Sequence, residues 1–219
     1  MTVQGVRVLY RDRWLLAVDK PSGLLSQPGL GPDQADSLIS RVQAHDQATD
    51  WRLVHRLDRD TSGVLLLAAG LEVLRRTSAL FSNRCVNKLY LAHVRGVLAG
   101  RGCIHNRLAR LQRQPPRYGP HPEGREASTL WRVRSSAAEV TQLWLRPITG
   151  RSHQLRSHLA EIAHPIIGDP IYGDPIDGDQ AAESPFSKRL RLHAIALSFC
   201  HPFTGQRLRL LSADPWSRR

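Results

Sequence analysis

Residues 55–63 read His55-Arg56-Leu57-Asp58-Arg59-Asp60-Thr61-Ser62-Gly63, and the apolar run Val64-Leu65-Leu66-Leu67-Ala68 follows directly. An unbroken apolar run of this length suits a strand buried on both faces. The polar residues before it then form a short loop on a rigid scaffold, which is a common way to build a functional site. Taken alone, the loop also suits a surface turn with weak ion pairs, so its purpose stays open at this point.

The remaining periodicity predicts strands with irregularly interspersed helices. This pattern favours an α+β or mixed-sheet fold over a regular βαβ winding. The expected elements are a hairpin at Val6–Tyr10 and Trp14–Val18, helices at Asp36–Gln47, Leu71–Phe81 and Ser152–Glu161, strands at Trp51–His55, Gly63–Ala69, Lys88–Val97, Ser128–Val133, Val140–Leu145, Leu190–Phe199 and Arg207–Leu211, and a loop at Gly168–Glu183.

The charge balance points to a polyanionic partner. The 219 residues hold 31 Lys and Arg against 19 Asp and Glu, a formal net charge of +12. Such a surface attracts nucleic acid through phosphate contacts, with an anionic membrane as the second candidate. Nearly all of the basic residues are Arg, whose planar fork suits phosphate, although GC-rich coding would also raise the Arg content.

One stretch, residues 98–125, concentrates this charge. It holds six Arg and four Pro but a single acid, Glu123. We expect an exposed basic insertion, a hairpin with a mobile tip, inside one domain that spans residues 1–219. The chain length would also fit two small lobes that share a sheet.

Cysteine usage and hydropathy indicate a cytoplasmic protein. The three Cys residues lie outside any Cys-x-x-Cys or metal-ligand spacing and are expected to be reduced thiols. Charged residues interrupt every apolar run in residues 1–30, so no signal peptide is predicted, and no run reaches the ~20 apolar residues of a membrane span.

A second polar cluster occupies residues 146–158. A helix starting near Ser152 would place Leu155, Arg156 and Leu159 on one face, and an Arg there can keep a nearby carboxylate ionised. His153 and His158 are five residues apart rather than four, so the cluster does not predict a metal site. By itself it would also suit a basic helix on a solvated face.

Together, these segments resemble the RluA-type pseudouridine synthase family, in the family's order and over about residues 6–211. The matching segments are Val18-Asp19-Lys20-Pro21-Ser22-Gly23, the loop at 55–63, Lys88-Leu89-Tyr90-Leu91-Ala92 with Val94 and Gly96, Pro147–His158, His164–Asp169 with Tyr172-Gly173, and Leu190–Ala194. The resemblance implies a pseudouridine synthase fold: a mixed, mostly antiparallel central sheet flanked by helices and loops, with the active-site cleft across the sheet. Many relatives carry an N-terminal S4 module, which this sequence is expected to lack.

The resemblance also implies residue roles. Asp58 matches the family's catalytic aspartate, Tyr90 its strand tyrosine and Arg156 its helix arginine. Arg56 is expected to handle a flipped nucleotide, and Leu192 to close the apolar side of the pocket, although a core role suits Leu192 nearly as well. We further expect an Asp58–Arg156 salt bridge.

The implied reaction is isomerisation of uridine to pseudouridine in large-subunit rRNA, tRNA or both, with no cofactor, metal, DNA or membrane partner, by a monomer. A carboxylate can attack C1′ or assist departure of the base, and the sequence leaves that choice open. The base must be flipped out first. RNA binding is assigned to the insertion, with Arg107, Arg110 and Arg113 as clamp residues.

Two other functions remain compatible with the residues. The first is a catalytically inactive RNA-binding or ribosome-assembly protein on the same fold. The second is a glycosidic-bond hydrolase that uses Asp58 and releases free uracil.

Overall fold

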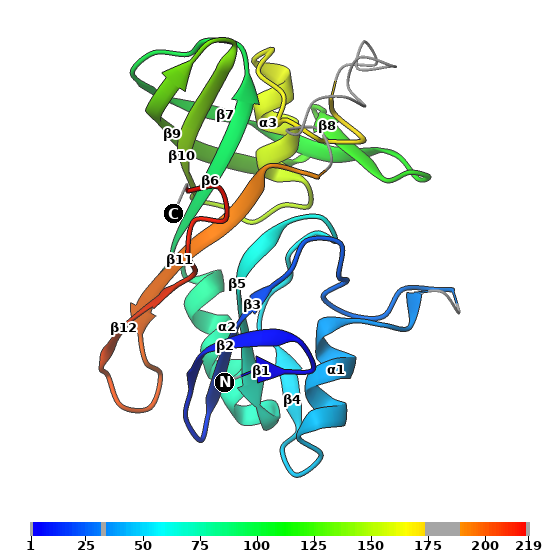
Figure 1. Ribbon diagram of the computed structural model, residues 1–219, viewed down its shortest axis with the longest axis vertical. Helices are drawn as coiled ribbons and strands as arrows, with labels where there is room; N and C mark the ends of the chain where they lie inside the picture. The colour runs from blue at the N-terminus through cyan, green and yellow to red at the C-terminus, as the bar shows by residue number, and fades with distance from the viewer. Residues whose placement is uncertain (1, 32–33, 174–188, 218–219) are drawn as a thin grey trace. The chain divides into compact units, whose positions relative to one another are not determined.

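The protein is represented by a computed structural model that describes residues 2–31, 34–173 and 189–217. The chain forms two units. The first comprises Met1–Lys88 and His193–Arg219, and the second comprises Leu89–Leu192. The chain passes between them within strands β6 and β11 (Figure 1).

The first unit holds a sheet in the order β1-β2-β3-β5-β11, with β4 paired to β5 and β12 paired to β11. Every strand pair in it is antiparallel except β5 with β11, which is parallel. Its strands are β1 (Thr2–Val3), β2 (Val6–Arg11), β3 (Leu15–Lys20), β4 (Trp51–Leu53), β5 (Ser62–Ala69), β11 (Leu192–Cys200) and β12 (Arg207–Leu211).

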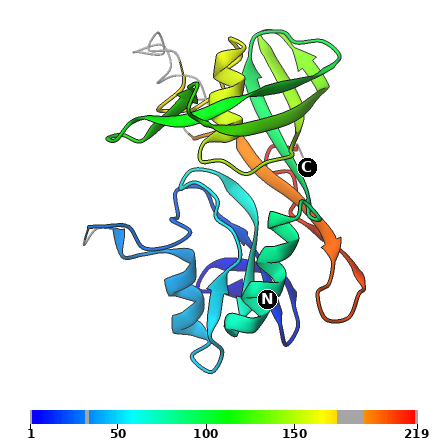
Figure 2. The same ribbon diagram turned by 180° about the vertical axis from the view of Figure 1, so that it is seen from behind.

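Strand β5 is the centre of this unit and is buried on both faces, as the apolar run predicts. Leu65, Leu66 and Leu67 are all fully buried, and burying each contributes about 1.5–3 kcal/mol relative to exposure. Helix α2 (Gly70–Ser82) runs beside β5, and α1 (Leu38–His45) lies beside β4 (Figures 1 and 2). The Ser37 hydroxyl caps α1 by accepting a hydrogen bond from the Ser40 N–H.

The second unit holds an antiparallel sheet in the order β6-β10-β9-β7-β8. Helix α3 (Gln154–Glu161) covers one face of it (Figure 1). Leu155 and Leu159 of α3 pack on Leu143 and Leu145 of the sheet. The strands are β6 (Asn87–Arg95), β7 (Arg101–Gln112), β8 (Arg117–Pro120), β9 (Arg125–Ala137) and β10 (Val140–Pro147).

The α+β fold with a mixed, mostly antiparallel sheet is therefore confirmed, and the predicted helices and strands form with small shifts at their ends. One difference concerns residues 98–125. They form the antiparallel pair β7–β8, but β7 also pairs along most of its length with β9, and Ile104 and Leu108 are buried. This stretch is thus built into the sheet rather than being wholly exposed, because its apolar residues fall on the inward side of the strand alternation. The predicted loop at Gly168–Glu183 lies outside the described residues from 174 onward.

Candidate active site

The Asp58 loop connects β4 to β5 in the first unit and closes as a tight turn, in which the Thr61 N–H donates to the Asp58 carbonyl at 3.1 Å. It ends at Gly63, whose φ of +111° is a backbone conformation that L side chains rarely adopt. A Cβ on Gly63 would lie 2.2 Å from the Ala194 carbonyl oxygen. Glycine is required here because β5 and β11 approach each other where Ser62 pairs with His193.

The side chain of Lys20 holds the backbone of this loop. It is fully buried, and its ammonium donates to the carbonyls of Pro21, Leu24 and Arg59 at 2.9, 2.7 and 2.8 Å. Burial lowers the pKa of Lys20 to about 8, against the opposing charges of Asp60 and Asp58. Lys20 therefore positions the backbone of the Asp58 loop and places a cation within electrostatic reach of Asp58.

Two serines fix the residues on either side of Asp58. The Ser26 hydroxyl donates to the Leu57 carbonyl at 2.7 Å and accepts from the Leu57 N–H at 3.1 Å. The Ser22 hydroxyl donates to the Asp60 carbonyl at 2.7 Å. The backbone on both sides of Asp58 is thus tied to the preceding turn.

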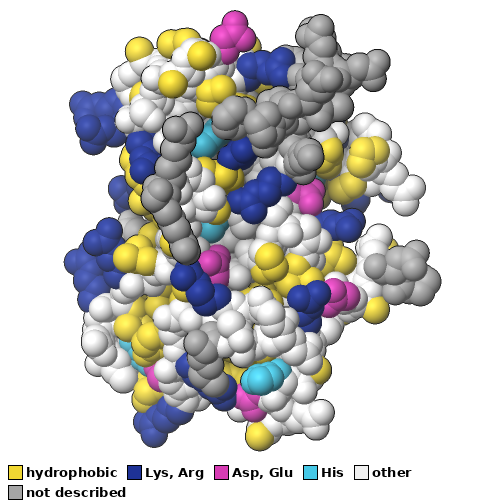
Figure 3. All heavy atoms as spheres, in the orientation of Figure 1, with side chains coloured by type: hydrophobic (Ala, Val, Ile, Leu, Met, Phe, Trp, Pro, Cys, Tyr) yellow, Lys and Arg dark blue, Asp and Glu magenta, His cyan; other side chains and the backbone are white. Residues whose placement is uncertain are grey.

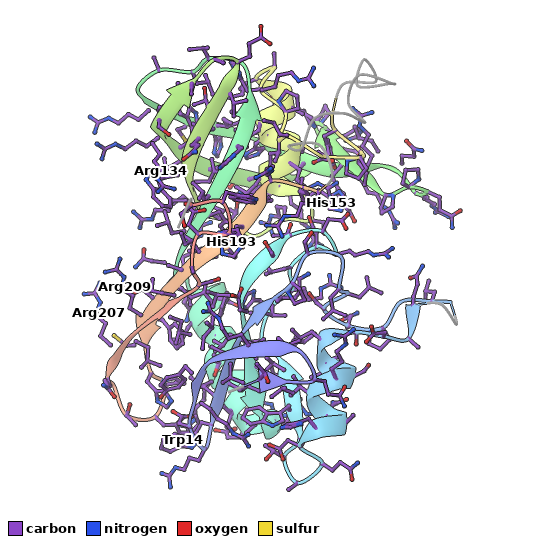
Figure 4. The ribbon with its side chains drawn as sticks, viewed as in Figure 1. Trp14, Arg134, His153, His193, Arg207 and Arg209 are labelled. Atoms are coloured by element: carbon purple, nitrogen blue, oxygen red, sulfur yellow. The ribbon has the colours of Figure 1, made fainter. Side chains whose placement is uncertain are left out.

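A buried chain of hydrogen bonds anchors the end of the loop. The Ser62 hydroxyl lies 2.9 Å from His193 Nδ1, and His193 Nε2 lies 3.0 Å from the Ser212 hydroxyl. All three side chains are buried, and Figure 4 labels His193 at the start of β11. Ser62 accordingly shapes the end of the loop.

His55 orients the start of the loop. Its Nε2 accepts a hydrogen bond from the Leu66 N–H at 3.2 Å, and its ring stacks on Phe81 with centroids 4.9 Å apart. Burial, with a smaller contribution from Lys88, lowers the pKa of His55 to about 4. A neutral imidazole that already accepts from the backbone suits an orienting role better than proton transfer.

Arg56 differs from these anchors because its side chain is exposed. This side chain makes no hydrogen bond or ion pair with any residue in the part of the chain that the structure describes. Its guanidinium is therefore available to a phosphate or a displaced nucleotide.

In the second unit, Arg156 on α3 forms a bidentate ion pair with Asp169. Nε and Nη2 of Arg156 lie 2.7 Å from Oδ2 and Oδ1 of Asp169, and both side chains are almost fully buried. Asp169 Oδ1 also accepts from the N–H groups of Ile171 and Tyr172. One carboxylate therefore holds the arginine and shapes the following turn.

That turn brings Tyr172 over the same arginine. The Arg156 guanidinium carbon lies 5.2 Å from the Tyr172 ring centroid, within cation–π range. The Tyr172 hydroxyl accepts from the Tyr118 N–H at 2.8 Å and lies 3.1 Å from Nδ1 of His153. His153, labelled in Figure 4, precedes α3 with a left-handed φ of 53°.

Tyr90 and Leu192 belong to the apolar core under α3. Leu192 is buried there, and Tyr90 is partly buried against the same cluster, opposite Leu145 on β10. The core role that the sequence allowed for Leu192 is confirmed, and its contact with a bound base stays a prediction.

The predicted site residues are divided between the two units. Asp58 and Arg56 belong to the first, whereas Tyr90, Arg156 and Leu192 belong to the second. The Asp58–Arg156 salt bridge and the cleft thus stay predictions, and within its own unit Arg156 is held by Asp169.

Asp169 and Tyr172 lie in a segment that resembles the family, but the resemblance implied no role for either residue. The available signal was the spacing of Asp169 and Tyr172 from Arg156. Helix and strand periodicity does not predict contacts between residues separated by a turn.

The three clamp arginines, Arg107, Arg110 and Arg113, are exposed on the β7–β8 pair. Arg107 Nε donates to the Gly124 carbonyl at 3.0 Å, and Arg110 Nη2 donates to the Arg113 carbonyl at 3.2 Å. Figure 3 shows Lys and Arg side chains over both units. Within the described ranges, no group of three or more His, Cys, Asp or Glu could hold a metal ion.

Comparison with known proteins places the chain in a family. Residues 14–161 match the family model described as RNA pseudouridylate synthase. The chain belongs to this family. The matched range includes Asp58, Tyr90 and Arg156, whereas Asp169 and Tyr172 follow it. The protein is therefore an RNA pseudouridine synthase, an isomerase.

Individual relatives agree with this assignment. The chain is 39% identical to the dual-specificity RNA pseudouridine synthase RluA of Vibrio vulnificus, over 89% of this chain and 78% of that protein. It is 38% identical to tRNA pseudouridine synthase C of Salmonella typhi, over 93% and 83% of the two chains. Among solved structures, human RNA pseudouridylate synthase domain containing 1 superposes with a TM-score of 0.79 at 25% identity, covering 99% of this chain and 86% of that one. No helix in the described part of the chain is long and apolar enough to cross a membrane.

Proposed function

We propose that this synthase converts uridines of large-subunit rRNA and of tRNA to pseudouridine, with Asp58 as the reacting carboxylate. The observation that supports this most is the fixation of the loop backbone at Leu57, Arg59 and Asp60 by buried or partly buried side chains. A loop held at both flanks presents the side chain between them in one geometry, which is what a reacting group needs.

The reaction requires no redox change. The N1–C1′ bond breaks, the uracil turns, and C5 bonds to C1′. Asp58 acts on this centre either as the nucleophile at C1′ or by assisting departure of the base. Arg156, oriented by Asp169, supplies a positive charge that pairs with Asp58.

Tyr90 and Arg56 serve the flipped nucleotide. Tyr90 stacks on the uracil and assists removal of the C5 proton. Arg56 enters the space that the base leaves or binds its phosphate, because its guanidinium is exposed and uncommitted. Extrusion of the base costs a few kcal/mol, which such contacts offset.

The clamp residues Arg107, Arg110 and Arg113 bind the RNA backbone. Their exposure on a strand pair built into the sheet supports this role. Arg→Ala changes at these positions are expected to weaken RNA binding and to flatten its dependence on salt.

We further propose that the protein is a cytoplasmic monomer that acts on RNA rather than DNA. The exposed free thiols of Cys85, Cys103 and Cys200 suit a reducing compartment. Exposed large apolar side chains come from separate segments, which favours a monomer over an apolar dimer interface. Light scattering during size-exclusion chromatography tests the monomer.

The proposed activity is tested with rRNA and tRNA transcripts that carry tritium at uridine C5. We expect tritium release from both pools without free uracil, and none with Asp58→Ala. Asp60→Ala is the matched control, since it removes a neighbouring carboxylate of the same loop and should retain activity. Release of free uracil would instead identify a hydrolase, and wild-type protein that binds RNA without tritium release would identify an inactive binding protein.

A further inference from the structure

The sheet of the second unit has a second face, away from α3, where the proposed function uses Arg107 alone. Side chains of β10 alternate, so Leu143 and Leu145 face α3 while Trp144 and Arg146 face the other way. We call this other side the outer arginine face. It carries Arg101 of β7, Arg132 and Arg134 of β9, and Trp144 and Arg146 of β10, and all four arginines are exposed.

The strand register places two of these arginines directly opposite each other. Arg101 of β7 pairs with Arg132 of β9, and like charges in directly opposed positions destabilise a sheet. Neither guanidinium makes a hydrogen bond or ion pair with any residue in the described ranges. Further along the same two strands, Arg107 pairs with Glu126, which is the ordinary, favourable arrangement. The unfavourable pair is therefore not forced by the fold.

An aromatic ring lies within this group of charges. Arg132 is opposite Trp144 on its other side, and the Arg134 guanidinium carbon lies 4.9 Å from the Trp144 ring. Arg146 follows two residues after Trp144, opposite Leu130. Figure 4 shows Arg134 on the side of the sheet away from α3. Arginines interleaved with an aromatic side chain are typical of surfaces that bind nucleic acid.

We propose that the outer arginine face binds RNA phosphates away from the target uridine. The proposal rests on the proposed function, since it assigns this face to the same RNA. Phosphates from the RNA backbone would neutralise the opposed charges of Arg101 and Arg132, which would give a pair that opposes folding a role in binding. RNA is favoured over a lipid surface because the face presents fixed charges on a sheet, with Leu130 as its one exposed large apolar side chain among the described residues.

Arg132→Glu separates this role from a structural one. The new carboxylate would lie opposite Arg101, so the melting temperature is expected to stay equal or rise. Affinity for a tRNA transcript is nevertheless expected to fall about tenfold, and the slope of log K against log salt to decrease by about 1 for the lost arginine contact. Arg75→Glu on α2 is the control, because it makes the same change in net charge at an exposed position of the other unit.

Binding measured by fluorescence anisotropy across a potassium chloride series gives these values without requiring catalysis. If wild type proves inactive, the proposed function fails while the assignment of the face is still decided by binding. RNA affinity of Arg132→Glu equal to that of Arg75→Glu would overturn the proposal. So would unchanged RNA binding combined with lost binding to phosphatidylserine vesicles, which would assign the face to lipid.

Discussion

In the first unit, the Asp58 loop is held mainly through its backbone, because Lys20, Ser22 and Ser26 all bond to main-chain groups. In the second unit, Arg156 is held through its own side chain, by the carboxylate of Asp169 and the ring of Tyr172. Because these contacts are made to the backbone, they do not depend on which side chain the loop carries at position 58. The contacts to Arg156 use its own guanidinium, so the position of Arg156 depends directly on Asp169 and Tyr172.

The largest expected effect is on the side-chain anchor. Asp169→Ala leaves the buried Arg156 without its bidentate partner, which should lower the free energy of unfolding by about 3–5 kcal/mol. Urea unfolding measures this change. The double variant Arg156→Met with Asp169→Leu removes both charges and should lose much less stability. Equal losses of stability in Asp169→Ala and in the double variant would show that the ion pair does not stabilise α3.

A smaller loss is expected for the backbone anchor. Lys20→Met keeps much of the aliphatic side chain but removes the ammonium that joins three carbonyls. Because those carbonyls lose a shared donor, stability should fall by about 2–3 kcal/mol, and the Thr61 amide should exchange with deuterium faster. Ser22→Ala, which removes one bond to the same loop, should cost only about 1 kcal/mol. Unchanged exchange at Thr61 in Lys20→Met would contradict the anchoring role.

The smallest effect on stability is expected only at acidic pH, and it involves one histidine in each unit. Burial lowers the pKa of His55 and of His158 to about 4, from the usual 6.5. The unfolded chain therefore takes up these protons first as the pH falls, so stability should be fully present above about pH 6.5 and decline toward pH 4.

Urea unfolding at several pH values measures this decline. His158→Gln should reduce its steepness by up to one proton, independently of its cost at neutral pH. An unchanged slope would mean that His158 is not buried in its neutral form.

The sequence predicted the helices and strands better than the side-chain contacts that hold the site residues in place. The β5 strand follows from an unbroken apolar run, and α1 from apolar periodicity behind a serine cap. The Arg156–Asp169 pair joins residues thirteen apart across a turn, and no periodic pattern encodes such a contact. In residues 98–125 the abundance of arginine concealed the alternation of Ile104 and Leu108, so this stretch was expected to be more exposed than it is.

The burial of Lys20 has a practical consequence for chemical labelling. The chain contains only three lysines, Lys20, Lys88 and Lys188. An amine-reactive reagent cannot reach Lys20 while its ammonium is enclosed by the three carbonyls. The rate of Lys20 acylation, followed by mass spectrometry, therefore measures how often the Asp58 loop opens. The same measurement with RNA present shows whether substrate keeps the loop closed.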